Sequence, residues 1–107
     1  MHRSQMSSKE RSTRSRIAKL IHYAPLMRAT VDVRRVTCGK ANCRCAEGER
    51  HLAVYVTSRK GGVRRQLFIP REKEEEVRLW VGNYHRVCEL LDELSELFWE
   101  RVTTKEK

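Results

Sequence analysis

The sequence has no apolar run that approaches the roughly 20 residues of a membrane-spanning helix. Residues 1–16, MHRSQMSSKERSTRSR, are basic and polar, and no hydrophobic stretch follows them, so we expect no secretory signal peptide. Both absences favour a cytoplasmic protein, in which thiols stay reduced. Disulfide bonds among the four cysteines are therefore disfavoured.

Motifs typical of enzymes are also missing. The sequence contains no C-x-x-C redox pair, no glycine-rich phosphate loop, no nucleophile elbow and no paired carboxylates in an apolar setting. A chain of 107 residues is long enough for one domain with a modest core, but not for a deep, walled active site. We therefore expect no catalytic residues and a protein that is not an enzyme.

Positive charge is abundant and unevenly placed. Residues 1–37 carry nine Lys and Arg against two Asp and Glu, residues 38–70 carry seven against two, and residues 71–107 carry seven against ten. A basic segment neutralises phosphates and releases their counterions, which drives non-specific nucleic-acid binding. A solvated basic surface that only keeps the protein soluble is the alternative. The asymmetry favours a nucleic-acid partner, and phosphate contacts by themselves do not distinguish DNA from RNA.

Local patterns divide the chain into a disordered basic arm and a single domain. The predicted segments are an arm over 1–13, a helix over 14–28, a strand and metal loop over 31–51, a β-hairpin over 52–69 and a long helix over 70–102. Pro25 should kink or end the first helix, because proline lacks an N–H. The SRKGG segment predicts the hairpin turn, since paired glycines supply positive φ angles.

The long helix carries a coiled-coil-like apolar seam of more than three heptads. A helix of about 30 residues is longer than a small hairpin can cover, so its outer half must meet the N-terminal helix, a second copy or another protein. We put dimerisation or partner binding ahead of intrachain packing. The predicted interface residues are Trp80, Tyr84, Val87, Leu91, Leu94 and Phe98.

Three of the four cysteines lie in the segment TCGKANCRCAEGERH, which ends at His51. Cys38, Cys43 and Cys45 have the spacing C-x4-C-x-C, and such close spacing lets one loop wrap a metal ion. With His51 they would form a closed Cys3His set, which is typical of a structural zinc site. A zinc ion would also supply folding free energy that a small core lacks.

The cysteines also allow other interpretations, namely a different fourth ligand or a reactive thiol. Cys88 and His85 are rival fourth ligands, although Cys88 lies among apolar positions of the long helix, where a cysteine is more often a small buried hydrophobe. Basic neighbours such as Lys40 and Arg44 would lower cysteine pKa values, which would suit a reactive thiol. The spacing and the absence of other catalytic features favour zinc.

The segment CGKANCRCAEGERH, the hairpin and the helix IPREKEEEVRLWVGNYHRVCELLDELSEL together resemble an uncharacterised family of short prokaryotic proteins. The resemblance covers residues 34–98 and implies Cys38, Cys43, Cys45 and His51 as the shared polar positions. Family members usually continue after the histidine with Gly-Pro-Tyr, whereas Leu-Ala-Val follows here. The family is associated with mobile elements and transposase-like contexts, which implies a DNA-related role without naming an activity.

The sequence therefore predicts an α+β fold: a zinc-stapled β-hairpin or three-stranded antiparallel sheet with an N-terminal helix and a long C-terminal amphipathic helix. The expected function is non-catalytic nucleic-acid binding, as an accessory to a DNA transaction such as transposition or regulation. The alternative is a protein-interaction module that acts through the long helix. An exposed Tyr55 or Phe68 would offer a base a stacking surface, although either is more often a core residue. The predicted phosphate contacts are Arg34, Arg35, Lys40, Arg44, Arg59, Lys60, Arg64 and Arg65.

Overall fold

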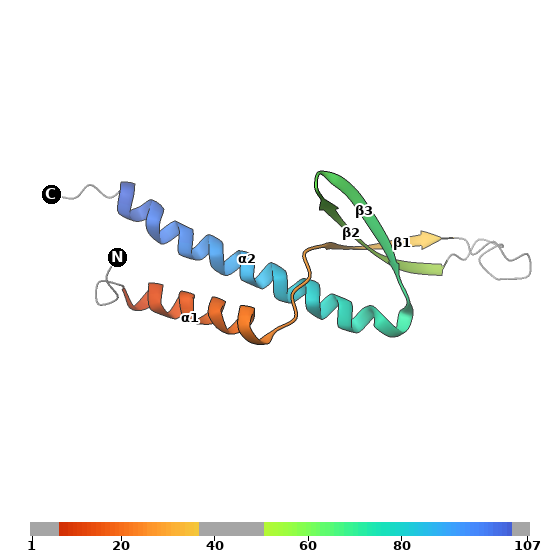
Figure 1. The fold of residues 1–107 in the computed structure, drawn as a ribbon, viewed down its shortest axis with the longest axis horizontal. Helices are drawn as coiled ribbons and strands as arrows, with labels where there is room; N and C mark the ends of the chain where they lie inside the picture. The colour runs from red at the N-terminus through yellow and green to blue at the C-terminus, as the bar shows by residue number, and fades with distance from the viewer. Residues whose placement is uncertain (1–6, 37–50, 104–107) are drawn as a thin grey trace, which may run out of the picture. The chain divides into compact units, whose positions relative to one another are not determined.

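The computed structural model describes residues 7–36 and 51–103, and the fold of these residues is α+β, as the sequence predicts (Figure 1). One compact unit holds α1 and the part of α2 from Gly82 onwards, and the other, Arg28–Val81, holds the sheet. The elements are α1 (Ser8–Tyr23), β1 (Thr30–Val36), β2 (His51–Lys60), β3 (Val63–Ile69), a 3-10 turn (Arg71–Lys73) and α2 (Glu74–Thr103).

Helix α1 begins at Ser8, six residues before the start that the sequence predicted. The reason is an N-cap: the Ser7 hydroxyl accepts a hydrogen bond from the Glu10 backbone N–H at 3.1 Å. Such a cap satisfies one of the donors that a helix start leaves without an intrahelical partner. The helix ends at Tyr23, because Ala24 is extended, as the residue before a proline prefers to be.

The three strands form one antiparallel sheet in the order β1-β2-β3. The predicted hairpin is confirmed, and β2 continues to Lys60. A two-residue turn joins β2 to β3: Gly61 has φ of 59° and Gly62 has φ of 82°. Two positive φ values define the turn type that matches the right-handed twist of paired strands, and glycine adopts them without strain.

The two faces of the sheet differ in character because side chains alternate along each strand. One face carries Val54, Val56 and Ile69, which are all buried. The other face, which we call the polar face, takes side chains from all three strands. Its central residues are Asp32 and Arg34 of β1, Tyr55 of β2, and Gln66 and Phe68 of β3.

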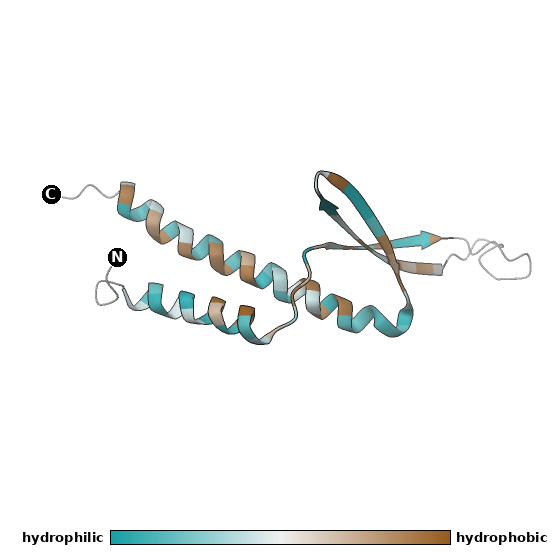
Figure 2. Ribbon diagram, in the orientation of Figure 1, coloured by the Kyte–Doolittle hydropathy of each residue, from teal (hydrophilic) through white to brown (hydrophobic). Residues whose placement is uncertain are grey.

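In the other unit, α1 runs antiparallel to the C-terminal part of α2 (Figure 1). Ile17 of α1 packs in a buried cluster with Val87 and Leu90 of α2, and Leu20 and Leu94 lie against this cluster. Hydrophilic residues dominate the start of α1 and hydrophobic residues its end (Figure 2). The apolar contact is therefore concentrated in the C-terminal half of α1.

Polar contacts join α1 and α2 on either side of that cluster. The Asn83 side-chain amide donates to the Pro25 carbonyl at 3.0 Å, just beyond the end of α1. Near the start of α1, Arg101 donates to the Glu10 carboxylate. These contacts set the register of the helix pair at its two ends.

Helix α2 spans 30 residues and begins after Pro70 and a 3-10 turn. Its first turn contains Glu74, Glu75 and Glu76, which suit the positive end of the helix dipole. In the described part of the chain, no helix is both long and apolar enough to cross a membrane.

Candidate nucleic-acid interface

The strands separate the predicted phosphate-binding residues onto two faces. By register, Arg34, Arg59 and Arg64 lie on the polar face. Their sequence neighbours Arg35, Lys60 and Arg65 lie on the opposite face, because adjacent residues in a strand point to opposite sides. Lys40 and Arg44 lie outside the described residues. The structure therefore does not bring the predicted set together as one patch.

Position along the strands separates the same residues further. Arg34 pairs with Ala53 near the start of β2, whereas Arg59 stands one residue before its end. Strand β2 has ten residues, so its ends are about 30 Å apart at ~3.3 Å per residue. The basic residues thus form two groups: one near the β1–β2 end of the sheet, and one at the β2–β3 turn.

The turn group contains a like-charged cross-strand pair. Arg59 and Arg64 are direct register partners in the hairpin, and both side chains are exposed. Arg59 Nη1 donates to the Gly62 carbonyl at 3.0 Å, while Arg28 donates to the backbone carbonyl of Arg59. Like charges directly opposite each other destabilise a sheet. An anion between these guanidinium groups would remove that penalty.

The group near the β1–β2 end is built around Arg34. Its Nε atom donates to Asp32 Oδ2 at 2.9 Å, and its Nη2 atom donates to Gln66 Oε1 of β3 at 2.8 Å. The guanidinium carbon also lies 4.7 Å from the centre of the Tyr55 ring, within cation–π range. These contacts from three strands hold the Arg34 side chain in place on the polar face.

An aromatic pair completes the polar face. Tyr55 and Phe68 are register partners, and their rings meet edge to face with centroids 5.7 Å apart. Phe68 is 52% exposed and Tyr55 is half-buried, so the Phe68 ring is not part of the core. The sequence suggested both as stacking residues only if exposed, and left them out of the predicted phosphate contacts, because sequence alone does not show which face of a strand is covered.

The predicted metal ligands fall largely outside the described residues. Cys38, Cys43 and Cys45 lie in the segment that joins β1 to β2, and His51 begins β2 as the register partner of Val36. The segment therefore leaves and re-enters the sheet at paired positions. Within residues 7–36 and 51–103, no group of three or more His, Cys, Asp or Glu side chains could hold a metal ion.

The rival ligands and the predicted interface residues belong to α2. Cys88 is half-buried and His85 is exposed. Val87 and Leu94 pack against α1, so these two predicted interface residues contribute to intrachain packing. The remaining four are half-buried or exposed: Trp80, Tyr84, Leu91 and Phe98.

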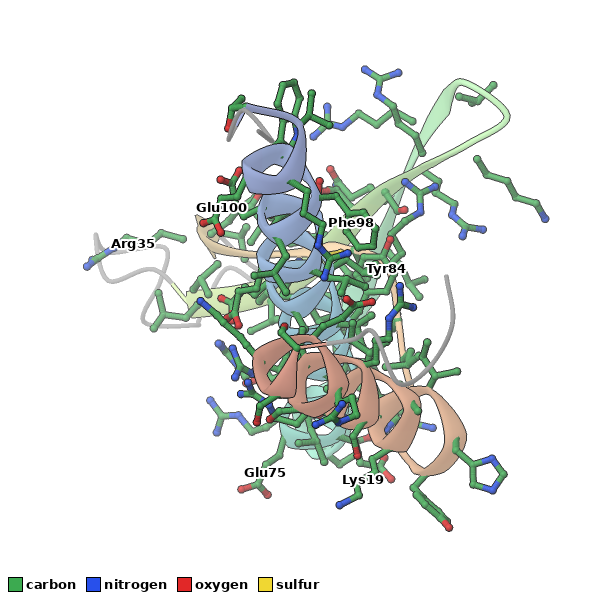
Figure 3. The ribbon with its side chains drawn as sticks, turned by 90° about the vertical axis from the view of Figure 1, so that its left-hand side faces the viewer. Lys19, Arg35, Glu75, Tyr84, Phe98 and Glu100 are labelled. Atoms are coloured by element: carbon green, nitrogen blue, oxygen red, sulfur yellow. The ribbon has the colours of Figure 1, made fainter. Side chains whose placement is uncertain are left out.

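A second apolar stripe on α2 lies beside the α1 contact. Its residues are spaced alternately four and three apart, and near the end of the helix the stripe borders an open groove of about 350 Å³ lined by Ser95, Phe98, Trp99 and Val102. Figure 3 shows Tyr84 and Phe98 on one side of α2 and Glu100 on the other. We call this set the second stripe: Tyr84, Cys88, Leu91, Ser95, Phe98 and Val102.

The chief electrostatic feature of the helix pair is the carboxylate of Glu10, which is only 1% exposed. Hydrogen bonds from Arg101, and then from Arg14, lower the pKa of the Glu10 carboxyl from its ordinary value of 4.5. Both guanidinium groups also lie near the Phe98 ring, at 6.0 Å for Arg14 and 4.6 Å for Arg101. This cluster stabilises the helix pair and does not belong to the polar face of the sheet.

Comparison with known proteins identifies a family but not an activity. A family model described as a domain of unknown function, DUF6788, matches residues 4–79. The match takes in α1, the sheet and the start of α2. Searches of curated proteins and of solved structures found no match. Because the family model covers more than half of the chain, this protein belongs to the DUF6788 family.

Proposed function

We propose that this protein binds nucleic acid without catalysing a reaction and that the sheet makes the contact. The observation that carries the proposal is the exposed cross-strand pair of Arg59 and Arg64 at the β2–β3 turn. Two arginines held directly opposite each other destabilise the free protein, but they suit a partner that supplies negative charge. A phosphate backbone is such a partner, and arginine binds phosphate through two parallel N–H groups.

Salt dependence tests this proposal. Each phosphate contact releases a condensed counterion, so the logarithm of the binding constant falls with the logarithm of the salt concentration. We expect Arg64→Ala to weaken binding to a labelled oligonucleotide and to reduce that slope by about one unit. The matched control is Arg78→Ala, which removes the same charge from an exposed position on α2. Equal effects of the two variants would show that only total charge matters.

A structural zinc ion and a DNA-related role complete the proposal. Cys38, Cys43, Cys45 and His51 would hold the zinc ion and close the segment between β1 and β2. Val36 ends β1 and His51 begins β2, and the two residues are register partners. This pairing supports the arrangement, because it places the two ends of the segment side by side in the sheet. A cytoplasmic protein with reduced thiols would suit zinc. An accessory role in transposition or regulation rests only on the family resemblance.

A second candidate function is self-association through the second stripe of α2. Leu91 is 47% exposed although it occupies a central position of that stripe. The charges of the two helices favour a second copy as the partner: α1 carries five Lys and Arg against one Glu, whereas α2 from Gly82 to Thr103 carries five Asp and Glu against two Arg. If the second stripe of one copy packed against the helices of the other copy, the acidic α2 of the first would lie near the basic α1 of the second.

The oligomeric state tests the second candidate. We expect the protein to dimerise in light scattering and Leu91→Asp to shift it to the monomer. Leu79→Asp is the control, since Leu79 is also an exposed leucine of α2 but lies off the stripe. A protein that is monomeric at high concentration would exclude self-association while leaving nucleic-acid binding untouched.

A further inference from the structure

We infer that the polar face of the sheet binds single-stranded nucleic acid by stacking unpaired bases on Phe68 and on the Arg34–Tyr55 pair. This inference rests on the proposed function and specifies its ligand. Proteins that bind single strands combine aromatic stacking surfaces with positive charge along the backbone path. The polar face supplies both, from residues that the strand register places on one side.

The exposure of Phe68 is the first observation that supports base stacking. Phe68 neighbours the buried Ile69 on β3, yet it lies on the opposite face and keeps 52% of its surface exposed. The Tyr55 ring meets it edge to face, which supports the Phe68 ring from the central strand. An exposed phenyl ring supported by a neighbouring aromatic ring is a ready stacking surface for a base.

The Arg34 guanidinium supplies a second planar surface. Asp32 and Gln66 hold it by hydrogen bonds of 2.9 and 2.8 Å, and the Tyr55 ring lies beneath it. Nucleobases stack on arginine planes as well as on aromatic rings. Because these contacts already orient the guanidinium, binding would lose little side-chain freedom there. The guanidinium reaches across the central strand to Gln66 of β3, so both stacking surfaces lie over β2 and β3.

Positive charge along β3 then gives the backbone of the single-stranded nucleic acid a path along the sheet. Arg64 lies on the same face as Phe68 and four residues closer to the turn, about 13 Å away along the strand. Arg59 stands opposite it in the register. Backbone phosphates next to the stacked bases would reach this pair. Gln66, between Phe68 and Arg64 on the polar face, would offer its side-chain NH2 group to a base edge, because its oxygen already accepts from Arg34.

A duplex cannot use these features, because its bases are already stacked and paired. A duplex would contact only the phosphate-binding arginines and would leave Phe68 without a role. The structure therefore favours single strands over duplexes, and the two ligands are separated by the variants below.

The experiment compares a labelled single-stranded oligothymidylate with a duplex of the same length, by fluorescence anisotropy. We expect the single strand to bind more tightly and Phe68→Ala to weaken its binding about 5- to 150-fold. Phe68→Trp should keep the affinity because it retains a stacking surface. Leu67→Ala is the control, since Leu67 is 59% exposed and lies on the opposite face of the same strand.

Each result has a definite meaning. Equal binding of duplex and single strand, both insensitive to Phe68→Ala, would overturn the stacking inference and leave nucleic-acid binding in place. Absence of binding to either ligand would overturn the proposed function as well. If Phe68→Ala does not fold by circular dichroism, Phe68→Leu replaces it, because leucine keeps an apolar side chain without a ring face. Wild-type affinity in the leucine variant would also overturn the inference.

Discussion

The carboxylate of Glu10 on α1 accepts a hydrogen bond from Arg101 of α2, a residue 91 positions away in the sequence. The same carboxylate accepts a second hydrogen bond from Arg14 at 2.8 Å, and it is almost completely buried. A buried carboxylate is stable only when charged partners such as these replace its water. This contact therefore ties the start of α1 to the end of α2.

Glu10 should make the stability of the helix pair depend on pH. Its carboxyl pKa is lowered below 4.5 in the folded protein, so its stabilising contribution is complete above that pH and is lost as pH falls through the folded-state pKa. We expect Glu10→Gln to melt at a lower temperature than wild type near neutral pH. The difference should shrink as the pH falls below 4.5.

Thermal melting followed by circular dichroism measures this difference. Glu96→Gln is the control, because it removes the same negative charge from an exposed position on α2. A gap between wild type and Glu10→Gln that stays constant from neutral to acidic pH would contradict the assigned ion pair.

Thr13 should be replaceable by valine with a gain in stability. Its side chain is 0% exposed, and its hydroxyl has no hydrogen-bond partner among the described residues. A buried unpaired hydroxyl is destabilising relative to a methyl group of similar shape. We expect Thr13→Val to raise the free energy of unfolding by about 1 kcal/mol in urea titrations. Ser12→Ala at the exposed neighbouring position should change it little, and a less stable valine variant would reveal a partner for the hydroxyl.

Replacing either of two glycines by alanine should change the stability of the protein, in opposite directions at the two positions. Gly82 lies inside α2, and a Cβ atom there meets nothing within 4 Å, so Gly82→Ala should stabilise the protein by about 1 kcal/mol through helix propensity. Gly62 has φ of 82°, so Gly62→Ala should destabilise it by about 1–2 kcal/mol through backbone strain. Urea titrations of both variants measure the two changes in the free energy of unfolding, which should have opposite signs. A stabilised Gly62→Ala variant would contradict the assigned turn.

Zinc content tests the proposed metal site directly. We expect about one zinc ion per chain in protein purified without chelator, and less in His51→Ala. His22→Ala serves as the control, because His22 is exposed on α1. Protein without any metal would remove the zinc proposal. The cysteines would then have to be considered as reactive thiols, and an enzymatic role would become the leading hypothesis.

Short-range patterns predicted several elements accurately. The GG pair predicted a hairpin turn, and strand β3 occupies the expected residues 63–69. A two-residue turn also determines the register next to it, so the opposition of Arg59 and Arg64 follows from the sequence once the turn is assigned. The same period of two would have placed Arg34 and Arg35 on opposite faces. The predicted site treated them as one patch because it considered charge and not strand alternation.

The start of α1 shows how a local signal can be overlooked. Ser7 and Glu10 have the spacing of a capping box, but the surrounding basic residues suggested a disordered arm. Sequence could have revealed the cap. It could not have revealed that Glu10 is buried, because its partner Arg101 comes from the far end of the chain.

The sequence by itself thus determined the element types, the hairpin turn and the uneven charge, because turn geometry, side-chain alternation and helix capping act over a few residues. The tertiary structure decided which stripe of α2 packs on α1 and which aromatic ring of the sheet remains exposed. Burial is a property of what covers a surface, and the covering residues come from distant parts of the chain. Val87 and Leu94 became core residues through α1, whereas Phe68 remained open on the polar face.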